Sequence, residues 1–345
     1  MMDALSKILD DIHMRGAEYL YVSGCNDWHF CLDTQGECVF HIVLFGDAVI
    51  EMQQSDHQPF VQSRASQSNN LQSHDKQQLI VQSSNASSSQ SHIHHMHAGQ
   101  IIIIPTGEKH HVYAHTNNAK LTAPFDLIPH FNGHRNDSIN LGGNTQARSL
   151  ILSIRCLLDV DMARPLLTAL PSLMTINNAM DAGAPPWLQI GLQFLALEAE
   201  RSRPGRDTLI NRLVTMLLIE CVRDYIEQLP EGSESWLIAL RDPQLAPVLS
   251  AIHAQPERAW TVAALASLAH MSRSTFAERF SQTIGETPLA YLAAHRLRLA
   301  AWYLRENNQG IGRIAEKVGY SSETAFSQAF KRQHGQSPSH YRKQS

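Results

Sequence analysis

The last 85 residues of the chain contain an internal repeat, and this feature limits the possible fold more than any other. The run GETPLAY reappears fifty positions later as GQSPSHY. At the same offset Phe276 and Phe280 match Phe326 and Phe330, whereas the matches further upstream are 49 positions apart. A repeat that slips by one residue at a single turn indicates two copies of one small helical motif.

Each copy has the sequence features of a helix-turn-helix. Ser272 and Ser322 can cap the second helix of the motif, and the turn before them contains His270 in the first copy and Gly319 in the second. The two phenylalanines of each copy are four residues apart, so they share one face of the helix and point inward. We therefore expect helix-turn-helix motifs at about 261–284 and 311–334, joined by a helix over 287–306.

The opposite face of each second helix is polar. Arginine and glutamine can hydrogen-bond base edges, serine and threonine can reach bases or phosphates, and lysine can neutralise phosphate. The alternative is that these side chains are only the solvated surface of a helical bundle. The candidate DNA-binding residues are Ser272, Arg273, Ser274, Ala277, Glu278, Arg279, Ser322, Glu323, Thr324, Ser327, Gln328, Lys331 and Arg332.

The joining helix sets the distance between the two motifs. A helix of about 19 residues is roughly 28 Å long. With the half-widths of the motifs added, the second helices can reach major-groove segments about 34 Å apart on one face of double-stranded DNA. The charge distribution also favours an anionic partner: residues 256–345 contain 12 Lys and Arg against 6 Asp and Glu, in a chain whose formal net charge is −4.

These residues resemble the AraC/XylS-type DNA-binding domain over roughly 245–343, which implies a transcription factor whose DNA-binding domain spans 245–345. The matching runs are Trp260-Thr261-Val262, Leu265-Ala266, Met271-Ser272-Arg273, Arg279-Phe280, Arg296, Ile314-Ala315, Val318-Gly319-Tyr320, Ser322-Glu323, Phe326–Lys331 and Tyr341-Arg342. The resemblance places base contacts on Ser274, Ala277 and Glu278 in the first copy, and on Glu323, Thr324, Ser327 and Gln328 in the second. Ala277 can offer only an apolar contact to a thymine methyl group.

The N-terminal part has the pattern of a β domain. Apolar runs of strand length occur at Gly36–Leu44, Ala48–Met52, Ile101–Ile104 and Leu150–Leu158. Residues 53–98 are rich in Gln, Ser, Asn and His and contain few apolar residues, so we expect a mostly disordered insertion there.

The pattern Gly99-x5-Pro105-x-Gly107-x2-His110 fits the second cupin motif at full spacing. The region resembles the degenerate, cupin-6-like domain of one AraC-type branch. We therefore expect an α+β protein of two domains: a cupin-like β-barrel with a helical hairpin, acting as a sensor over 1–185, and an all-α tandem helix-turn-helix.

The metal-binding features of a cupin are incomplete. A metal cupin needs about three histidines and a carboxylate on one ion, whereas no HxH motif occurs here and only His41, Glu51 and His110 are candidate effector or metal residues. No cofactor is expected, and a bound transition metal is the alternative. The histidine-rich run 92–97 is either a low-complexity tract or a site for Ni, Cu or Zn.

The cysteines offer a second sensing chemistry. Cys25, Cys31 and Cys38 lie within fourteen residues, and a pair of them close in the fold can form a disulfide under oxidants. Buried, inert cysteine is the alternative, and it is the expectation for Cys156 and Cys221. The predicted effector is therefore a small organic molecule or an oxidant. The alternative is that the protein responds to no small effector.

Residues 186–244 predict a helical dimerisation and linker region. Leu188, Leu192 and Leu195 share one helical face, and Leu209 and Met216 share another, with a break at Arg203-Pro204-Gly205. These apolar faces exceed what an isolated hairpin needs, so we expect a homodimer. The alternative is that both faces pack on the cupin-like domain.

The combined features predict a cytoplasmic transcription regulator that is not an enzyme and is not embedded in a membrane. Its expected partners are double-stranded DNA, RNA polymerase, a second copy of the chain, and a small-molecule or oxidant effector. One alternative is a cupin metal-binding protein or enzyme with an appended DNA-binding domain. Another is a structural DNA binder without sequence preference, which the glutamates on the recognition faces argue against.

Overall fold

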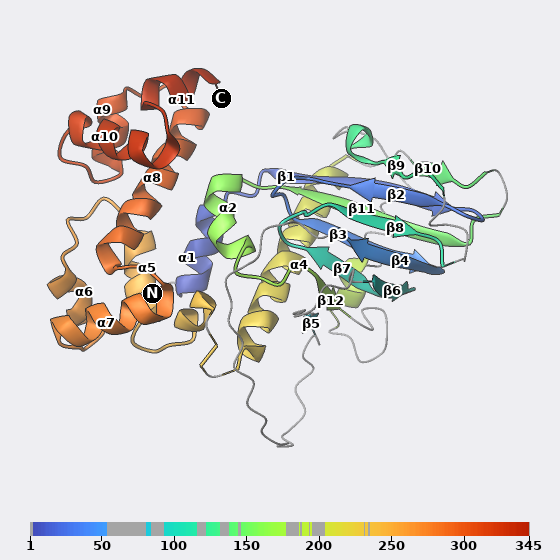
Figure 1. Ribbon diagram of the computed structural model, residues 1–345, viewed down its shortest axis with the longest axis horizontal. Helices are drawn as coiled ribbons and strands as arrows, with labels where there is room; N and C mark the ends of the chain where they lie inside the picture. Colours follow the sequence, from blue (N-terminus) through green and yellow to red (C-terminus); the bar gives the residue numbers. More distant parts are fainter. Residues whose placement is uncertain are drawn as a thin grey trace. The chain divides into compact units, whose positions relative to one another are not determined.

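The computed structural model describes residues 3–53, 81–83, 93–115, 122–131, 138–143, 146–176, 186, 188–192, 194, 204–230, 232–233 and 235–344. The chain forms two compact units that are interleaved in sequence (Figure 1). The helical unit comprises Met1–His13, Asp159–Ala169 and Ile226–Ser345, and the strand-rich unit comprises Met14–Leu158 and Leu170–Tyr225.

The strand-rich unit contains two sheets. The seven-stranded sheet has the order β10-β1-β11-β3-β7-β12-β5, and the five-stranded sheet has the order β6-β4-β8-β2-β9. The strands are β1 (Gly16–Gly24), β2 (His29–Leu32), β3 (Val39–Phe45), β4 (Asp47–Met52), β5 (Val81–Ser83), β6 (Ile93–His97), β7 (Ile101–Ile104), β8 (His110–Tyr113), β9 (Phe125–Asp126), β10 (Ser138–Leu141), β11 (Ser149–Leu157) and β12 (Met174–Ile176).

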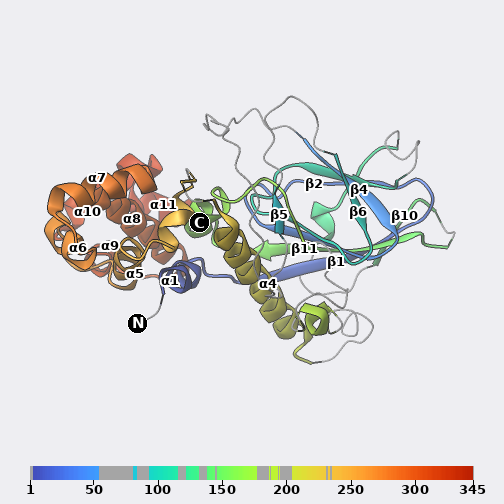
Figure 2. The ribbon, with the colours of Figure 1, turned by 90° about the horizontal axis from the view of Figure 1, so that it is seen from below.

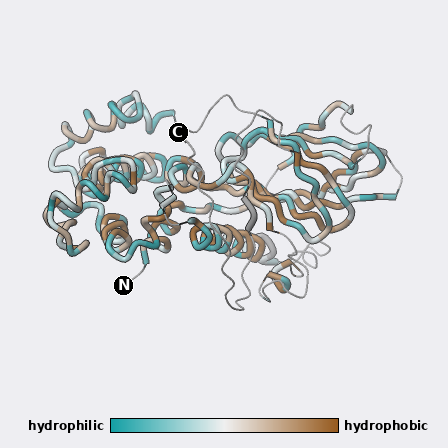
Figure 3. The backbone as a smooth tube through the Cα atoms, turned by 60° about the horizontal axis from the view of Figure 1, so that its bottom comes forward, coloured by the Kyte–Doolittle hydropathy of each residue, from teal (hydrophilic) through white to brown (hydrophobic). Residues whose placement is uncertain are grey.

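The core of this unit lies between the two sheets, because the same hydrophobic cluster contains Leu20 and Val22 of β1 and Phe30 and Leu32 of β2. All four isoleucines of β7 are buried, as expected for a short continuous apolar run. Many residues of the strands are accordingly coloured as hydrophobic in Figure 3.

Two strands occur inside the range predicted to be a disordered insertion, 53–98. β6 pairs with β4, and β5 pairs with β12. The composition did not predict these two strands. Both are held by backbone hydrogen bonds to a neighbouring strand, and such bonds can form in a segment with few apolar residues. Residues 54–80 and 84–92 lie outside the described residues.

Helix α4 (Arg206–Gln228) is the long helix of the 186–244 region. The Asn211 side chain accepts a hydrogen bond of 2.7 Å from the backbone N–H of Ala17, so α4 lies beside the start of β1 (Figure 2). Of the expected preceding helix, only residues 186, 188–192 and 194 are described, and they are helical.

The helical unit contains the tandem repeat. Its elements are α1 (Ala4–Asp11), α2 (Val160–Leu167), the short 3-10 helix η3 (Trp236–Leu240), α5 (Ala246–Ala254), α6 (Val262–Leu268), α7 (Arg273–Ile284), α8 (Pro288–Glu306), α9 (Ile311–Lys317), α10 (Glu323–His334) and α11 (Pro338–Gln344). Helix α8 runs between the pair α6/α7 and the pair α9/α10 (Figure 1).

Two short helices from the predicted sensor region belong to the helical unit. Helix α1 packs on α5, and α2 packs on α8. The two units therefore do not follow the predicted boundaries at residues 185 and 244. Contacts between residues this far apart in sequence leave no local pattern that would reveal them. None of the helices in the described ranges has the length and apolar character of a membrane-spanning segment.

Candidate nucleic-acid interface

The second helices of the two motifs begin and end in equivalent ways. The Ser272 hydroxyl accepts a hydrogen bond from the backbone N–H of Thr275, and Ser322 accepts one from Ala325. Both helices end at a left-handed glycine, at Gly285 and at Gly335. The equivalent ends support two copies of one helix-turn-helix.

Each second helix is held by a buried pair of aromatic rings. Phe276 and Phe280 of α7, and Phe326 and Phe330 of α10, are all 0% exposed. The ring centroids are 5.6 Å apart in both pairs. The first pair lies in one hydrophobic cluster and the second pair in another, so each motif has its own core. Burial of these rings fixes which face of each helix points outward.

Most of the predicted DNA-binding side chains lie on that outward face. Exposed members are Ser272, Arg273, Ser274, Glu278, Ser322, Glu323, Thr324, Gln328, Lys331 and Arg332, and partly buried members are Ala277, Arg279 and Ser327. Arg273 and Gln328 are both exposed, which the DNA-binding interpretation requires. Two members are already engaged in capping, since Ser272 and Ser322 cap α7 and α10.

Arg279 is engaged in a contact within the protein. Its guanidinium donates to the Asp242 carboxylate at 2.5 Å and to the Gln244 side-chain oxygen at 2.6 Å. These partners precede α5, so Arg279 ties α7 to the segment that enters the DNA-binding region. A positioning role for Arg279 is thus visible in the geometry, and its assignment as a base contact stays a prediction.

Arg296 of α8 connects two loops of the helical unit, a role that the sequence did not predict. Its Nε donates to the carbonyl oxygen of Pro256 at 2.6 Å, and its Nη2 donates to that of Arg258 at 2.8 Å. A Cβ at Gly319 would lie 2.6 Å from this Nη2. Arg296 therefore connects the loop before α6 with the turn of the second motif.

In the strand-rich unit the predicted cupin residues His41 and His110 meet. Their Nε2 atoms are 2.8 Å apart. The Nδ1 of His110 lies 2.7 Å from the carbonyl oxygen of Glu108, and the Nδ1 of His41 lies 2.9 Å from the Ser153 hydroxyl. A carbonyl only accepts, so His110 donates to it through Nδ1 and accepts from His41 through Nε2; His41 Nδ1 then accepts from Ser153.

This assignment of donors and acceptors holds when both imidazoles are neutral. Burial lowers the pKa of His110 to about 4, and it lowers the pKa of His41 well below its usual value, with the neighbouring His110 adding to the shift. Both rings are 0% exposed. Their nitrogen atoms are all used within the protein.

The third candidate, Glu51, does not join the histidine pair. In the pairing of β4 with β8, Met52 is opposite His110 and Glu51 is opposite His111. Adjacent positions on a strand point to opposite faces of the sheet, so Glu51 lies on the face away from His110. The Tyr113 hydroxyl donates to Glu51 at 3.2 Å. Among the described residues this arrangement does not fit the ligand set of a metal cupin.

Comparison with known proteins agrees with both parts of the chain. A helix-turn-helix domain family matches residues 265–344, and a cupin family matches residues 79–227. The chain is 45% identical over 344 residues to the HTH-type transcriptional regulator AlkR of Acinetobacter baylyi, covering 100% of both chains. It is 46% identical to a putative AraC-like transcription regulator of Streptomyces lividans, over 41% of this chain and 47% of that one.

The chain belongs to the AraC family of HTH-type transcriptional regulators. It is also 37% identical to the RCS-specific HTH-type transcriptional activator RclR of Escherichia coli, over 52% of this chain and 63% of that one. The resemblance to AraC-type proteins and the α+β class with a cupin-like N-terminal region are thereby confirmed. The chain is a DNA-binding transcription regulator.

The cysteines of this AraC-family chain include a neighbourhood that the prediction did not name, and redox sensing by Cys25, Cys31 and Cys38 stays a prediction. The thiol of Cys38 neighbours Cys156 and Cys221. Burial raises the pKa of Cys31, Cys38 and Cys221, which disfavours the reactive thiolate. Cys156 and Cys221 are buried, as expected.

Proposed function

We propose that this AraC-family regulator recognises a specific sequence of double-stranded DNA with α7 and α10, placed in successive major-groove segments. The observation that carries this proposal is the pair of outward polar helix faces, each fixed by buried phenylalanines. Helix α8 joins the two motifs and has 19 residues, which supports a spacing that suits adjacent turns of a duplex.

We further propose that the cupin-like unit senses a small molecule or an oxidant and changes the affinity for DNA or the contact with RNA polymerase. The relative named as an RCS-specific activator supports a chemical signal as the effector. Cys25, Cys38, Cys156 and Cys221 are buried, so an oxidant would reach them only after the strand-rich unit opens, whereas Cys31 is partly exposed. The protein acts in the cytoplasm and is not an enzyme.

The regulator is proposed to be a homodimer held by α4. Leu209 and Met216 of this helix are exposed at 38% and 45%, and they are seven residues apart, so they lie on one face.

Met216→Glu should shift the purified protein from dimer to monomer in light scattering, because a carboxylate in an apolar interface is left unpaired. Arg313→Glu, at an exposed position of α9 outside this helix, is the matched charge-reversal control and should stay dimeric. A dimer that survives Met216→Glu contradicts the assignment.

Sequence-specific binding is tested at Gln328. DNA fragments bound by the full chain, with and without added oxidant or small molecules, are first sequenced to define the preferred site. Gln328→Ala should then weaken binding to that site by about 1–3 kcal/mol while leaving random DNA unaffected, because the Gln328 amide can hydrogen-bond a base edge only in the preferred sequence.

Gln333→Ala is the control on the same helix, since Gln333 is also exposed but is not among the predicted base contacts. Titration with salt separates phosphate contacts from base contacts. An equal loss on specific and random DNA would show that Gln328 reads no base. Binding without any preferred site would refute the proposed function.

A further inference from the structure

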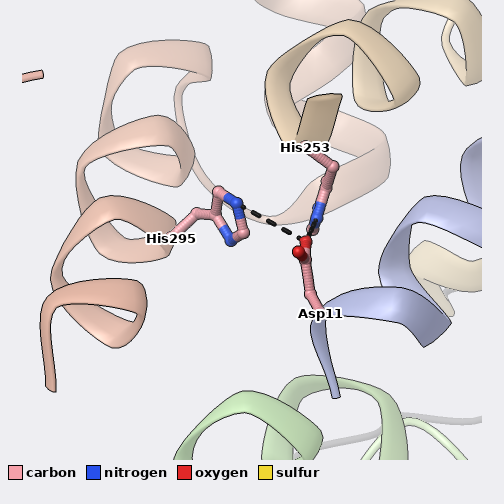
Figure 4. A group of neighbouring side chains, drawn as sticks. All are labelled: Asp11, His253 and His295. Atoms are coloured by element: carbon pink, nitrogen blue, oxygen red, sulfur yellow. Dashed lines mark hydrogen bonds and ion pairs between the residues drawn. The ribbon is translucent and has the colours of Figure 1, made fainter. Parts of the chain in front are cut away.

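Three ionisable side chains from three helices of the helical unit meet at a site remote from the recognition faces. Asp11 is the last residue of α1, His253 lies near the end of α5, and His295 lies within α8. Figure 4 shows both imidazoles directed at the Asp11 carboxylate. The His295 side chain is 1% exposed, that of His253 5% and that of Asp11 19%.

The distances leave one nitrogen atom without a hydrogen-bond partner. Asp11 Oδ2 is 2.6 Å from His253 Nδ1 and 3.6 Å from His295 Nε2. His295 Nε2 is buried and makes no hydrogen bond. One ligand atom from each of the three residues lies within 4.8 Å of the other two. Ligands around a tetrahedral zinc ion are roughly 3.3 Å apart, so small side-chain rotations bring all three within bonding distance.

The surroundings already orient one of the rings. His253 Nε2 lies 2.8 Å from the hydroxyl oxygen of the buried Tyr291, which leaves Nδ1 as the atom that faces Asp11 and His295. Metal-binding histidines are commonly held in this way through their second nitrogen. A cavity of about 20 Å³ lies beside the three side chains, which is room for one water molecule.

The charged side chains that line the cavity indicate which class of metal ion could bind. Arg298 lines the same cavity, and Asp11 is the single carboxylate among the cavity-lining residues described. A hard ion such as Ca²⁺ or Mg²⁺ depends on several oxygen ligands and would not bind here. A cation that gains its affinity from imidazole nitrogen atoms tolerates this arrangement.

We infer that Asp11, His253 and His295 form a binding site for a late first-row divalent metal ion, with Zn²⁺ as the best match and water as the fourth ligand. The ion would join the N-terminal helix α1 to two helices of the DNA-binding region. Metal occupancy therefore stabilises the attachment of α1, and it does so independently of which effector the strand-rich unit binds.

The test must first remove competing histidines. The histidines of β6, of which His95 and His97 are exposed and His94 is half-buried, are replaced in a His94→Gln, His95→Gln, His97→Gln background of the full chain. This protein is then dialysed against a chelator. Titration with Co²⁺ should give the intense visible absorption of a tetrahedral site at one equivalent, and Zn²⁺ should displace it. Zn²⁺ should also raise the thermal unfolding midpoint.

Asp11→Asn and His295→Gln, made in the same background, should each weaken Zn²⁺ binding about a hundredfold or more and abolish the rise in midpoint. His340→Gln, an exposed histidine of α11, is the control and should bind as the background does. X-ray absorption of the zinc-loaded background protein should show two imidazole ligands, a measurement that needs no variant to fold. No retained equivalent of zinc, or unchanged affinity in folded His295→Gln, would overturn the site.

Discussion

At the scale of single residues, the two motifs differ most at their turn. His270 and Gly319 occupy the corresponding position, with φ of 52° and 87°. Most residues with a Cβ pay about 1 kcal/mol or more for this left-handed conformation, whereas glycine does not. The first motif therefore stores strain that the second avoids.

Separate substitutions of these two residues should change the free energy of unfolding in opposite directions. His270→Gly should raise the free energy of unfolding of the helical unit by up to about 1 kcal/mol. Gly319→Ala should lower it by about 2–3 kcal/mol, because the new Cβ would also lie 2.7 Å from the carbonyl oxygen of Glu257. Urea unfolding followed by circular dichroism measures both.

Gly335→Ala separates backbone strain from the steric clash. Gly335 has φ of 75°, but nothing lies within 4 Å of a Cβ placed there. Its substitution should therefore cost less than that of Gly319. Equal losses at the two positions would show that the contact with Glu257 and Arg296 is unimportant.

The residues that could be predicted from the sequence are those whose role depends on near neighbours. The caps Ser272 and Ser322 and the phenylalanine pairs follow from spacings of three and four residues. Thr287 occupies the N-cap position of α8 but makes no side-chain hydrogen bond there. Arg296 could not be assigned, because its acceptors are about 40 positions earlier.

At the scale of elements, α2 is tied to the last helices of the chain by Arg305. The guanidinium donates to Asp159 at 2.6 Å and to Asp161 at 2.8 Å, and the Tyr341 hydroxyl donates to Asp161 at 3.0 Å. Burial raises the pKa of Asp161, but the hydrogen bonds from Arg305 and Tyr341 outweigh it and hold the pKa below its usual value. Asp159 has a side chain that is only 1% exposed.

Removal of this guanidinium should be costly. Arg305→Met should lower the free energy of unfolding by about 3–5 kcal/mol at neutral pH, because it removes the guanidinium charge that faces the buried Asp159 carboxylate. Arg313→Met, at an exposed position of α9, should change stability little. Asp159→Asn should restore part of the loss in the Arg305→Met background. A loss below about 1 kcal/mol in chemical denaturation would mean that water solvates Asp159 in place of Arg305.

The elements of the strand-rich unit were predictable where the sequence contains a short, mostly apolar run. β7 was placed at its observed bounds, and β11 within one residue. The partners of β5 and β6 were not foreseeable, because their pairing depends on sheets assembled from distant segments. The docking of α1 is the extreme case, since Asp11 and His253 are 242 positions apart.

At the scale of the whole molecule, the interleaved units give the chain several covalent connections between the strand-rich unit and the helical unit. The backbone passes from one unit to the other at His13/Met14, Leu158/Asp159, Ala169/Leu170 and Tyr225/Ile226. A regulator with a single flexible linker would have one such passage. A change in the strand-rich unit therefore has several covalent routes to the helical unit, as the proposed modulation of DNA binding requires.

The stability of the strand-rich unit should depend on pH through the buried histidine pair. The pKa of His110 is about 4 in the folded chain, and an unfolded histidine has a pKa near 6.5. Between these values the unfolded state binds more protons, so stability is full above about pH 6.5 and is lost as the pH falls toward 4. His110 alone should lower the free energy of unfolding by about 2 kcal/mol between pH 7.5 and pH 5, and His41, whose pKa is also lowered, should add to the loss.

Hydrogen exchange of the β7 amides, corrected for the intrinsic effect of pH on exchange, reports this loss within the strand-rich unit alone. His110→Gln should reduce the pH dependence, because the amide can replace the hydrogen bonds to His41 and to the carbonyl of Glu108 without taking up a proton. His97→Gln, which removes an exposed histidine from the same unit, should leave the dependence as it is in the natural chain. Protection of β7 that is unchanged from pH 7.5 to pH 5 would mean that the pair takes up a proton without leaving its buried position.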